Sequence, residues 1–251
     1  MKTTNWELNG DCLNIMGELQ TEDINEISKL PMIRVIQPWK FMPGEQNWLQ
    51  LNEKFFSTHP DTKLHIWADT IQSDFLFLSK MSHVRHLNLN QVKFKDSETL
   101  GHLKDLKSLV LINGNVNQLE FLSQLKKMEL LEIGRIKGLS DISFISNLTE
   151  LRSLNINNQI QIQQLPDFSQ NKELKIVTLI NLKKMVGISN LSQLEKLEEL
   201  ACHGLSNELA PEQFHFLKNC KQLKTVRFHA NTREKNKQFE AFINQVLTER
   251  K

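Results

Sequence analysis

Apolar residues recur along this chain in a short phrase, with apolar side chains at its first, fourth and sixth positions. Two copies lie between residues 128 and 156, and their apolar residues are Met128, Leu131 and Ile133, then Leu151, Leu154 and Ile156. The alternation at the end of the phrase is typical of a half-buried strand, whereas the residues that follow are apolar at every third position, which suits a loosely helical return. The pattern therefore predicts a coil made of a short strand and a return leg.

The phrase is repeated at a nearly constant spacing of 22 or 23 residues, with a last step of 26. Upstream, Leu30, Ile33 and Val35 predict a ninth copy. A weaker tenth copy begins at Gly10 and includes Leu13. A period of this length indicates stacked coils that bury a continuous core between neighbours. The eight regular copies begin at Asp61, Val84, Leu106, Met128, Leu151, Leu174, Leu197 and Leu223.

The repeated phrase resembles the strand signature of the leucine-rich repeat family, LxxLxLxxN or C, and its period resembles that of the short class typified by internalins. Residues 139–151, LSDISFISNLTEL, are especially similar to the return leg of that class. The resemblance covers about residues 11–231 and implies an α/β leucine-rich repeat solenoid. Such a solenoid is a right-handed horseshoe with a concave parallel β-sheet and an irregular or helical convex side. The family is a scaffold for binding, so the resemblance implies a non-enzymatic protein-binding module.

The ninth position of the phrase departs from the family pattern, which places Asn there to hold the turn after the strand. Only the last copy has Asn, and four copies have an apolar residue in its place. We therefore expect packing to hold most of these turns. The ninth positions read Asp69, Val92, Gly114, Ile136, Gln159, Leu182, Leu205 and Asn231.

The chain is predicted to be one solenoid domain with a distinct segment at each end. Residues 1–60 are expected to form an N-terminal cap with degenerate repeats, and residues 61–231 the regular repeats. Residues 232–251 are expected to form a C-terminal capping helix. A terminal coil has no neighbour on one side, so an element with one apolar side must cover its core.

Helical spacing within the two end segments indicates where their helices lie. Trp48, Leu51 and Phe55 predict a helix over residues 45–57 on the convex side, with Asn52 facing water. At the other end, Asn231 or Thr232 is expected to cap a helix. The apolar side of that helix is predicted to consist of Phe239, Phe242, Ile243 and Val246.

The third, fifth and seventh positions of each strand are expected to point away from the core, onto the concave face. Several of them are apolar, and a folded protein seldom leaves clustered apolar side chains on an accessible concave surface without use. The alternative is that β-branched residues there only favour the strand conformation. The residues predicted to bind a protein partner are Trp67, Val110, Ile112, Leu130, Glu132, Arg135, Ile176, Ile180, His203 and Arg227.

Two histidines on neighbouring coils, His203 and His229, share the seventh position, so their rings are predicted to approach to about 4.8 Å, the spacing of strands. With no third ligand evident beyond Glu199, we expect no metal site and no cofactor. His65 and His86 form a diagonal pair to which the same expectation applies.

Composition narrows the choice of partner and compartment. The chain has 31 Lys and Arg against 29 Asp and Glu, and a net charge of +2 gives no reason to expect nucleic acid or a membrane surface as partner. No stretch reaches the length of a signal peptide's apolar run or of a membrane span. Cys12, Cys202 and Cys220 lack metal-ligand spacing and are expected to be reduced thiols. These features predict a cytoplasmic monomer.

Catalytic motifs are missing from the sequence: it has no Gly-rich phosphate loop, no HExxH and no GxSxG. Catalytic residues are therefore not expected. Two alternatives to a simple binding module stay open. One is a regulator or enzyme acting on a GTPase or another signalling protein, and the other is an immunity protein that neutralises a toxin.

Overall fold

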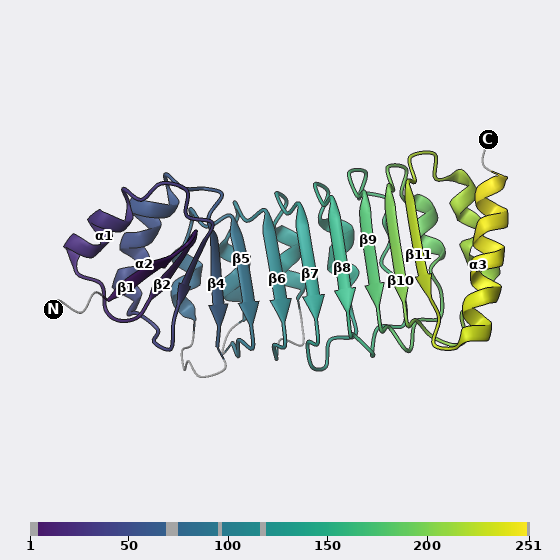
Figure 1. The fold of residues 1–251 in the computed structure, drawn as a ribbon, viewed down its shortest axis with the longest axis horizontal. Coiled ribbons are helices and arrows are strands. Elements are labelled where there is room, and N and C mark those ends of the chain that lie inside the picture. The colour runs from purple at the N-terminus through teal and green to yellow at the C-terminus, as the bar shows by residue number, and fades with distance from the viewer. Residues whose placement is uncertain (1–4, 69–74, 95–96, 116–118, 250–251) are drawn as a thin grey trace. The chain divides into compact units, whose positions relative to one another are not determined.

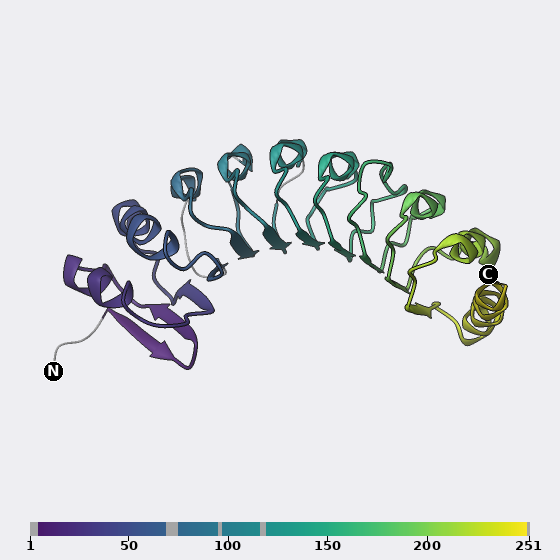
Figure 2. The ribbon, with the colours of Figure 1, turned by 90° about the horizontal axis from the view of Figure 1, so that it is seen from above.

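The structure is a computed structural model, and it describes residues 5–68, 75–94, 97–115 and 119–249. The chain separates into two compact units, Met1–Val116 and Asn117–Lys251. In each unit the strands follow one another in chain order within a sheet (Figure 1). Seen from above, each unit has its strands on one side and its helical return legs on the other (Figure 2). None of the described helices is both long and apolar enough to cross a lipid bilayer.

The first unit combines a helical end with regular coils. Strand β1 pairs antiparallel with β2, and the strands from β2 to β6 are parallel. Its strands are β1 (Trp6–Asn9), β2 (Cys12–Ile15), β3 (Val35–Pro38), β4 (Lys63–Trp67), β5 (His86–Asn90) and β6 (Ser108–Ile112). Its helices are α1 (Thr21–Ile27), α2 (Glu45–Leu51), which continues as a π-helical turn over Asn52–Phe56, and the 3-10 helices Leu76–Lys80 and Ser97–His102.

The second unit contains parallel strands and ends in a long helix. Residues 158–175, all described, connect two strands through turns without any helix. Its strands are β7 (Leu130–Gly134), β8 (Ser153–Asn157), β9 (Ile176–Ile180), β10 (Glu199–His203) and β11 (Thr225–His229). Its helices are α3 (Arg233–Thr248) and the 3-10 helices Glu120–Gln124, Ser143–Asn147, Ser189–Gln193 and Pro211–Asn219.

The core consists of the phrase's apolar positions stacked in register. Leu131 pairs with Leu154, which is in turn opposite Val177, and all three are fully buried. Equivalent positions of neighbouring strands therefore lie side by side, and each coil covers the apolar residues of the next. The predicted repeat and its strand positions are confirmed for every copy from Asp61 onward whose pairing is described within a unit.

The predicted ninth copy is out of register by three residues. Ile36, and not Ile33, pairs with Leu64, so that the sixth position of this copy is Pro38. The tenth copy is correct, because Leu13 pairs with Ile36. Leu30 is apolar but belongs to the segment after α1, and it made the wrong alignment look as regular as the right one.

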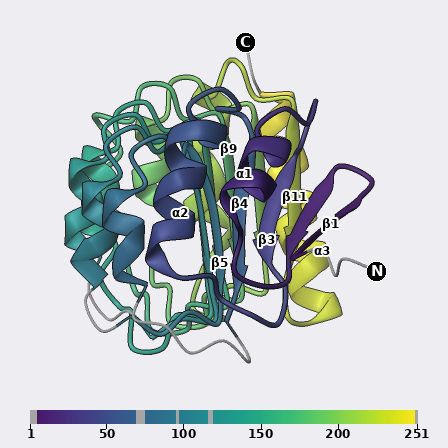
Figure 3. The same cartoon turned by 90° about the vertical axis from the view of Figure 1, so that its left-hand side faces the viewer.

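Strand β1, which the repeat pattern does not predict, forms a hairpin with β2 at the outer edge of the first unit (Figure 3). Its two-residue loop is Gly10 and Asp11. Gly10 has φ of +63°, a conformation that glycine adopts at little cost because it has no Cβ. An antiparallel strand therefore covers the edge of the sheet at this end.

The turns after the strands use amides that lie one position earlier than in the family pattern. The eighth residue of seven copies has a positive φ, and among these are Asn113, Asn158 and Asn181. Asn113 Nδ2 donates to Asn90 Oδ1 at 2.9 Å, and Asn181 Nδ2 donates to Asn158 Oδ1 at 3.0 Å. Asn tolerates this left-handed conformation better than most residues. The four apolar residues at the ninth position are buried, as expected: Val92, Ile136, Leu182 and Leu205.

The convex-side helix of the first unit begins and ends close to its predicted bounds, but one of its polar residues does not face water. Trp48, Leu51 and Phe55 are fully buried. Asn52 is also buried, at 1% exposure, and its Oδ1 accepts from the backbone N–H of His83 at 3.0 Å. The prediction for Asn52 was wrong, because a hydrogen bond to the next coil satisfies its amide inside the protein.

The C-terminal helix α3 packs against the last strand. Thr232 caps it by accepting from the backbone N–H of Lys235 at 3.3 Å. Phe239 stacks on Phe228 of β11, with ring centroids 4.2 Å apart. Phe242 is only half-buried, so Phe239 is the main apolar anchor of this helix.

Candidate functional site: the outward face of the parallel strands

Alternate residues of the parallel strands point away from the core in both units. We call the surface made by the third, fifth and seventh positions the sheet face; it is the concave face of the prediction. In β9, for example, Val177 and Leu179 are fully buried, whereas Ile176 is 38% exposed. The backbone of each strand is held on both sides by its neighbours, so these side chains project from a rigid base.

The second unit holds most of the predicted partner-binding residues. Leu130, Glu132, Ile176, Ile180, His203 and Arg227 all occupy sheet-face positions. Arg135 differs, because it follows β7 in a turn with φ of +52° and lies exposed at the edge of the face. The pairing places Ile176 between Ser153 and Glu199, and Ile180 between Asn157 and His203. The apolar residues are thus bordered by polar groups.

A chain of side-chain hydrogen bonds crosses β7, β8 and the turns beside them. Asn181 donates to Asn158, Asn158 Nδ2 donates to Asn157 Oδ1 at 3.3 Å, and Asn157 Nδ2 donates to Glu132 Oε1 at 3.1 Å. A Cβ at Gly134 would lie 2.4 Å from Asn157 Oδ1, so the glycine makes room for this amide. The network orients the Glu132 carboxylate on the sheet face, and repeat counting does not predict it.

The two histidines at the end of β10 and β11 approach as predicted. The ring centroids of His203 and His229 are 4.8 Å apart. His203 Nε2 is buried and has no hydrogen-bond partner among the described residues. Burial, and then the nearby His229 and Arg227, lower the pKa of His203 below its usual 6.5. Among the described residues, the two imidazoles are not joined by a third His, Cys, Asp or Glu in a cluster able to hold a metal.

Charged side chains at the strand entries pair with one another. Lys175 Nζ lies 2.9 Å from Glu198 Oε1, and Lys224 also donates to this carboxylate. Hydrogen bonds from Lys224 and then Lys175 lower the pKa of Glu198 to about 2. Arg152 Nε is 3.9 Å from Glu129 Oε2 one coil earlier. These second-position charges pair across neighbouring coils, and Arg227 lies exposed on the face of β11.

In the first unit, Trp67, Val110 and Ile112 also occupy sheet-face positions, as predicted. His65 and His86 form the expected diagonal, since His65 pairs with Asn88 and His86 with Lys63. Burial and the nearby Lys63 lower the pKa of His65.

The corrected register adds two residues that the sequence prediction missed. Trp39 follows β3 at the seventh position, and Met16 follows β2 at the same position. Their exposed fractions are 51% and 38%, next to 55% for Trp67. We call Met16, Trp39 and Trp67 the Trp row. The signal lay in the sequence: VIQPW at 35–39 aligns with KLHIW at 63–67, with the two tryptophans in one column.

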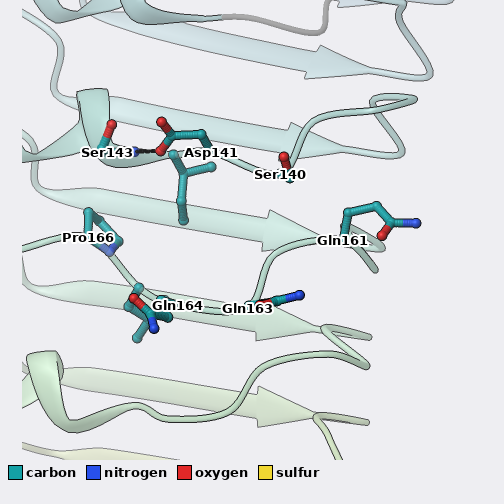
Figure 4. A pocket seen from close by; sticks show the side chains of 9 residues that line it. Ser140, Asp141, Ser143, Gln161, Gln163, Gln164 and Pro166 are labelled. Carbon is teal, nitrogen blue, oxygen red and sulfur yellow. Dashed lines mark hydrogen bonds between the residues drawn. The ribbon is translucent and has the colours of Figure 1, made fainter.

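A pocket of about 540 Å³ lies in the second unit away from the sheet face, between return legs (Figure 4). It forms where the leg after β8 has no helix, and no predicted site residue lines it. Asp141 is the one carboxylate of its lining, and Asp141 Oδ1 already accepts from the backbone N–H of Ser143 at 2.8 Å. The polar residues that line it are Ser140, Asp141, Ser143, Gln161, Gln163 and Gln164. This set offers hydrogen bonds but no nucleophile with a base.

Comparison with known proteins establishes the fold. No family model matches the sequence. No curated protein matches it either. Among solved structures, an internalin (inlF) from Listeria monocytogenes superposes with a TM-score of 0.51 at 18% identity, covering 87% of this chain and 68% of the internalin. A second internalin of that organism, internalin C2, gives a TM-score of 0.50 at 18% identity over 87% of this chain and 80% of its own.

A plant protein has the same architecture. The LRR ectodomain of the membrane receptor kinase GASSHO1/SCHENGEN3 from Arabidopsis thaliana, in complex with CASPARIAN STRIP INTEGRITY FACTOR 2, superposes with a TM-score of 0.53 at 16% identity. The match covers 86% of this chain and 26% of the ectodomain. At these identities the likeness shows the fold, and the fold expected from the sequence is confirmed: the chain is a leucine-rich repeat solenoid.

Proposed function

We propose that this leucine-rich repeat chain is a non-enzymatic protein-binding module that holds a protein partner on its sheet face. The observation that carries the proposal is the exposure of Ile176 on β9, together with Ile180 at the other end of the strand, in a setting of polar side chains. Interfaces gain most of their binding energy from a few apolar and Arg anchors inside a polar rim. In the second unit Arg227 and the oriented carboxylate of Glu132 supply charged groups for that rim.

Rigidity supports the same proposal. Ile176 and Ile180 sit on a strand that is hydrogen-bonded on both sides, so little conformational entropy is lost when a partner covers them. The plant ectodomain with this fold was solved in complex with CASPARIAN STRIP INTEGRITY FACTOR 2. A fold that presents a regular sheet to another molecule is suited to binding without any change in its own backbone.

The chemistry of the thiols supports a binding role over catalysis. Cys202 is fully buried, and burial raises the pKa of its thiol to about 12. Cys220 is also buried. A thiol in this state is a poor nucleophile, because the thiolate is the reactive form. Three free cysteines further support a reducing compartment, and we place the chain in the cytoplasm as a monomer; size-exclusion chromatography with light scattering tests the second part.

The test begins with a partner captured by affinity pull-down from the native cell. Ile176→Lys and Ile180→Lys should each weaken that partner about tenfold or more, because a desolvated ammonium replaces an apolar contact. Both should melt close to wild type, since neither side chain enters the core. Ile160→Lys is the matched control: Ile160 is 51% exposed in the return leg after β8, and its replacement should leave binding unchanged.

Wild-type affinity in both sheet-face variants, with their melting unchanged, would refute a partner site on the second unit. Loss of binding in Ile160→Lys alone would move the site to the return legs.

A further inference from the structure

The Trp row is the largest set of exposed apolar side chains on the sheet face of the first unit. Met16, Trp39 and Trp67 occupy the same position of three successive coils, as counted from the pairs Leu13–Ile36 and Ile36–Leu64. The backbone beneath them is held in place: Trp39 N donates to Ile15 O at 2.7 Å, and Ala68 N, just after Trp67, donates to Asn90 O at 2.9 Å. The indole rings therefore stand on a fixed base. Exposed tryptophans so placed are typical interface anchors.

Apart from the Trp row and from Cys12, Val35, Val110 and Ile112, the sheet-face positions of β2 to β6 are polar, and they carry positive but no negative charge. Gln37 Nε2 donates to Asn14 Oδ1 at 2.8 Å, and both residues share the fifth repeat position with His65. Lys63 stands in the third column of β4. The third, fifth and seventh positions of β2 to β6 are all described, and none of them is Asp or Glu. The carboxylate of Glu7 lies at the sheet edge, on β1 opposite Asn14, three strands away from Lys63. At the described sheet-face positions of β3, β4 and β5, an occupant meets cationic and neutral groups.

The spacing along β4 matches that of an extended peptide. Trp67, His65 and Lys63 are alternate residues of one strand, so neighbouring members are about 7 Å apart and the two ends about 13 Å apart. An extended peptide repeats its same-side residues at that distance. A peptide aligned with β4 can thus place an apolar side chain on the Trp row, a polar or backbone group at His65 and Gln37, and a third side chain at Lys63.

We propose that the sheet face of the first unit binds an extended peptide segment of the protein partner, in which an apolar side chain and a carboxylate are four residues apart. The apolar side chain packs on the Trp row at Trp67, and the carboxylate pairs with Lys63. This inference rests on the proposed function and names the chemistry of the partner. The lowered pKa of His65 fits a neutral ring that exchanges hydrogen bonds with the peptide backbone.

The probe is a library of random peptides displayed on phage and selected on the immobilised full chain, with an oligosaccharide array as a second probe. Selected peptides should share an apolar residue and an Asp or Glu four positions apart. Trp39→Ser and Trp67→Ser should each weaken such a peptide about tenfold or more. Peptides selected on Lys63→Glu should carry Lys or Arg in place of the Asp or Glu. Met32→Ser is the matched control: Met32 is 85% exposed just before β3, outside the sheet face, and its replacement should change nothing.

Each variant is compared with wild type by thermal melting, so that a misfolded protein is recognised. Selection without the apolar and acidic pair, or peptides that bind Trp39→Ser as well as wild type, would overturn the inference. Trp-dependent binding of oligosaccharides and not of peptides would overturn it too. If either result occurs while the native partner still depends on Ile180, the inference has failed and the proposed function stands.

Discussion

Phe239 anchors the C-terminal helix to the last coil, and its removal should destabilise the second unit strongly. The side chain is 3% exposed, stacks on Phe228 at 4.2 Å and meets Phe214 edge-on at 5.7 Å. Phe→Ala in a packed core costs about 3–5 kcal/mol, from lost transfer energy and from the cavity left behind. We expect Phe239→Ala to lower the free energy of unfolding by about 3 kcal/mol, because the helix can settle partly into the space.

Phe242 is the matched control on the same helix. It is half-buried, with its ring 6.4 Å from that of His215, so Phe242→Ala should cost about 1 kcal/mol. Urea denaturation followed by circular dichroism gives both values, and hydrogen exchange of the β11 amides reports whether the last strand opens first. If the two variants lose equal stability, or if β11 stays as protected in Phe239→Ala as in wild type, Phe239 is not the anchor of this cap.

His203 and the thiols give two further predictions. The folded state holds the pKa of His203 below the unfolded value of 6.5, so stability is fully present above about pH 6.5 and is lost as pH falls towards the folded pKa. Between about pH 7.5 and pH 5.5, the free energy of unfolding of His203→Asn, measured by urea titration, should therefore fall less than that of wild type. Equal falls would contradict the lowered pKa of His203. Iodoacetamide should label Cys12 slowly, because burial and then Asp11 raise its pKa, and should leave Cys202 unlabelled until the protein unfolds. Mass spectrometry that found Cys202 labelled as fast as Cys12 in the folded state would refute this.

The architecture of the coils could be read from the sequence because each coil repeats the same local requirement. A strand needs alternating burial, and stacked coils need their apolar positions one above another, so a period of 22 or 23 residues specifies which side chains enter the core. The alternation also placed Trp67, Ile176 and Ile180 outward, and it brought His203 beside His229. Wherever the phrase was intact, the apolar pattern of one strand predicted which residues of the neighbouring strands lie beside it.

The first coils were decided by tertiary contacts. Two alignments of residues 30–38 satisfy the apolar pattern about equally, and only the pairing of Ile36 with Leu64 selects the one that gives Trp39 the same repeat position as Trp67. A register is a relation between two strands, and an irregular copy with proline at a core position does not carry enough local information to specify it.

The positions of several polar side chains were likewise decided by tertiary contacts. The burial of Asn52 depends on the backbone N–H of His83 in the next coil, and the place of Glu132 depends on the amide of Asn157 one strand away. Likewise, the helical spacing of α3 makes Phe239 and Phe242 look equivalent, whereas the position of Phe228 decides which ring is buried. Periodicity along the chain determined which residues are apolar neighbours within an element, and the three-dimensional packing determined the partner of every group whose hydrogen bond or ring contact comes from another coil.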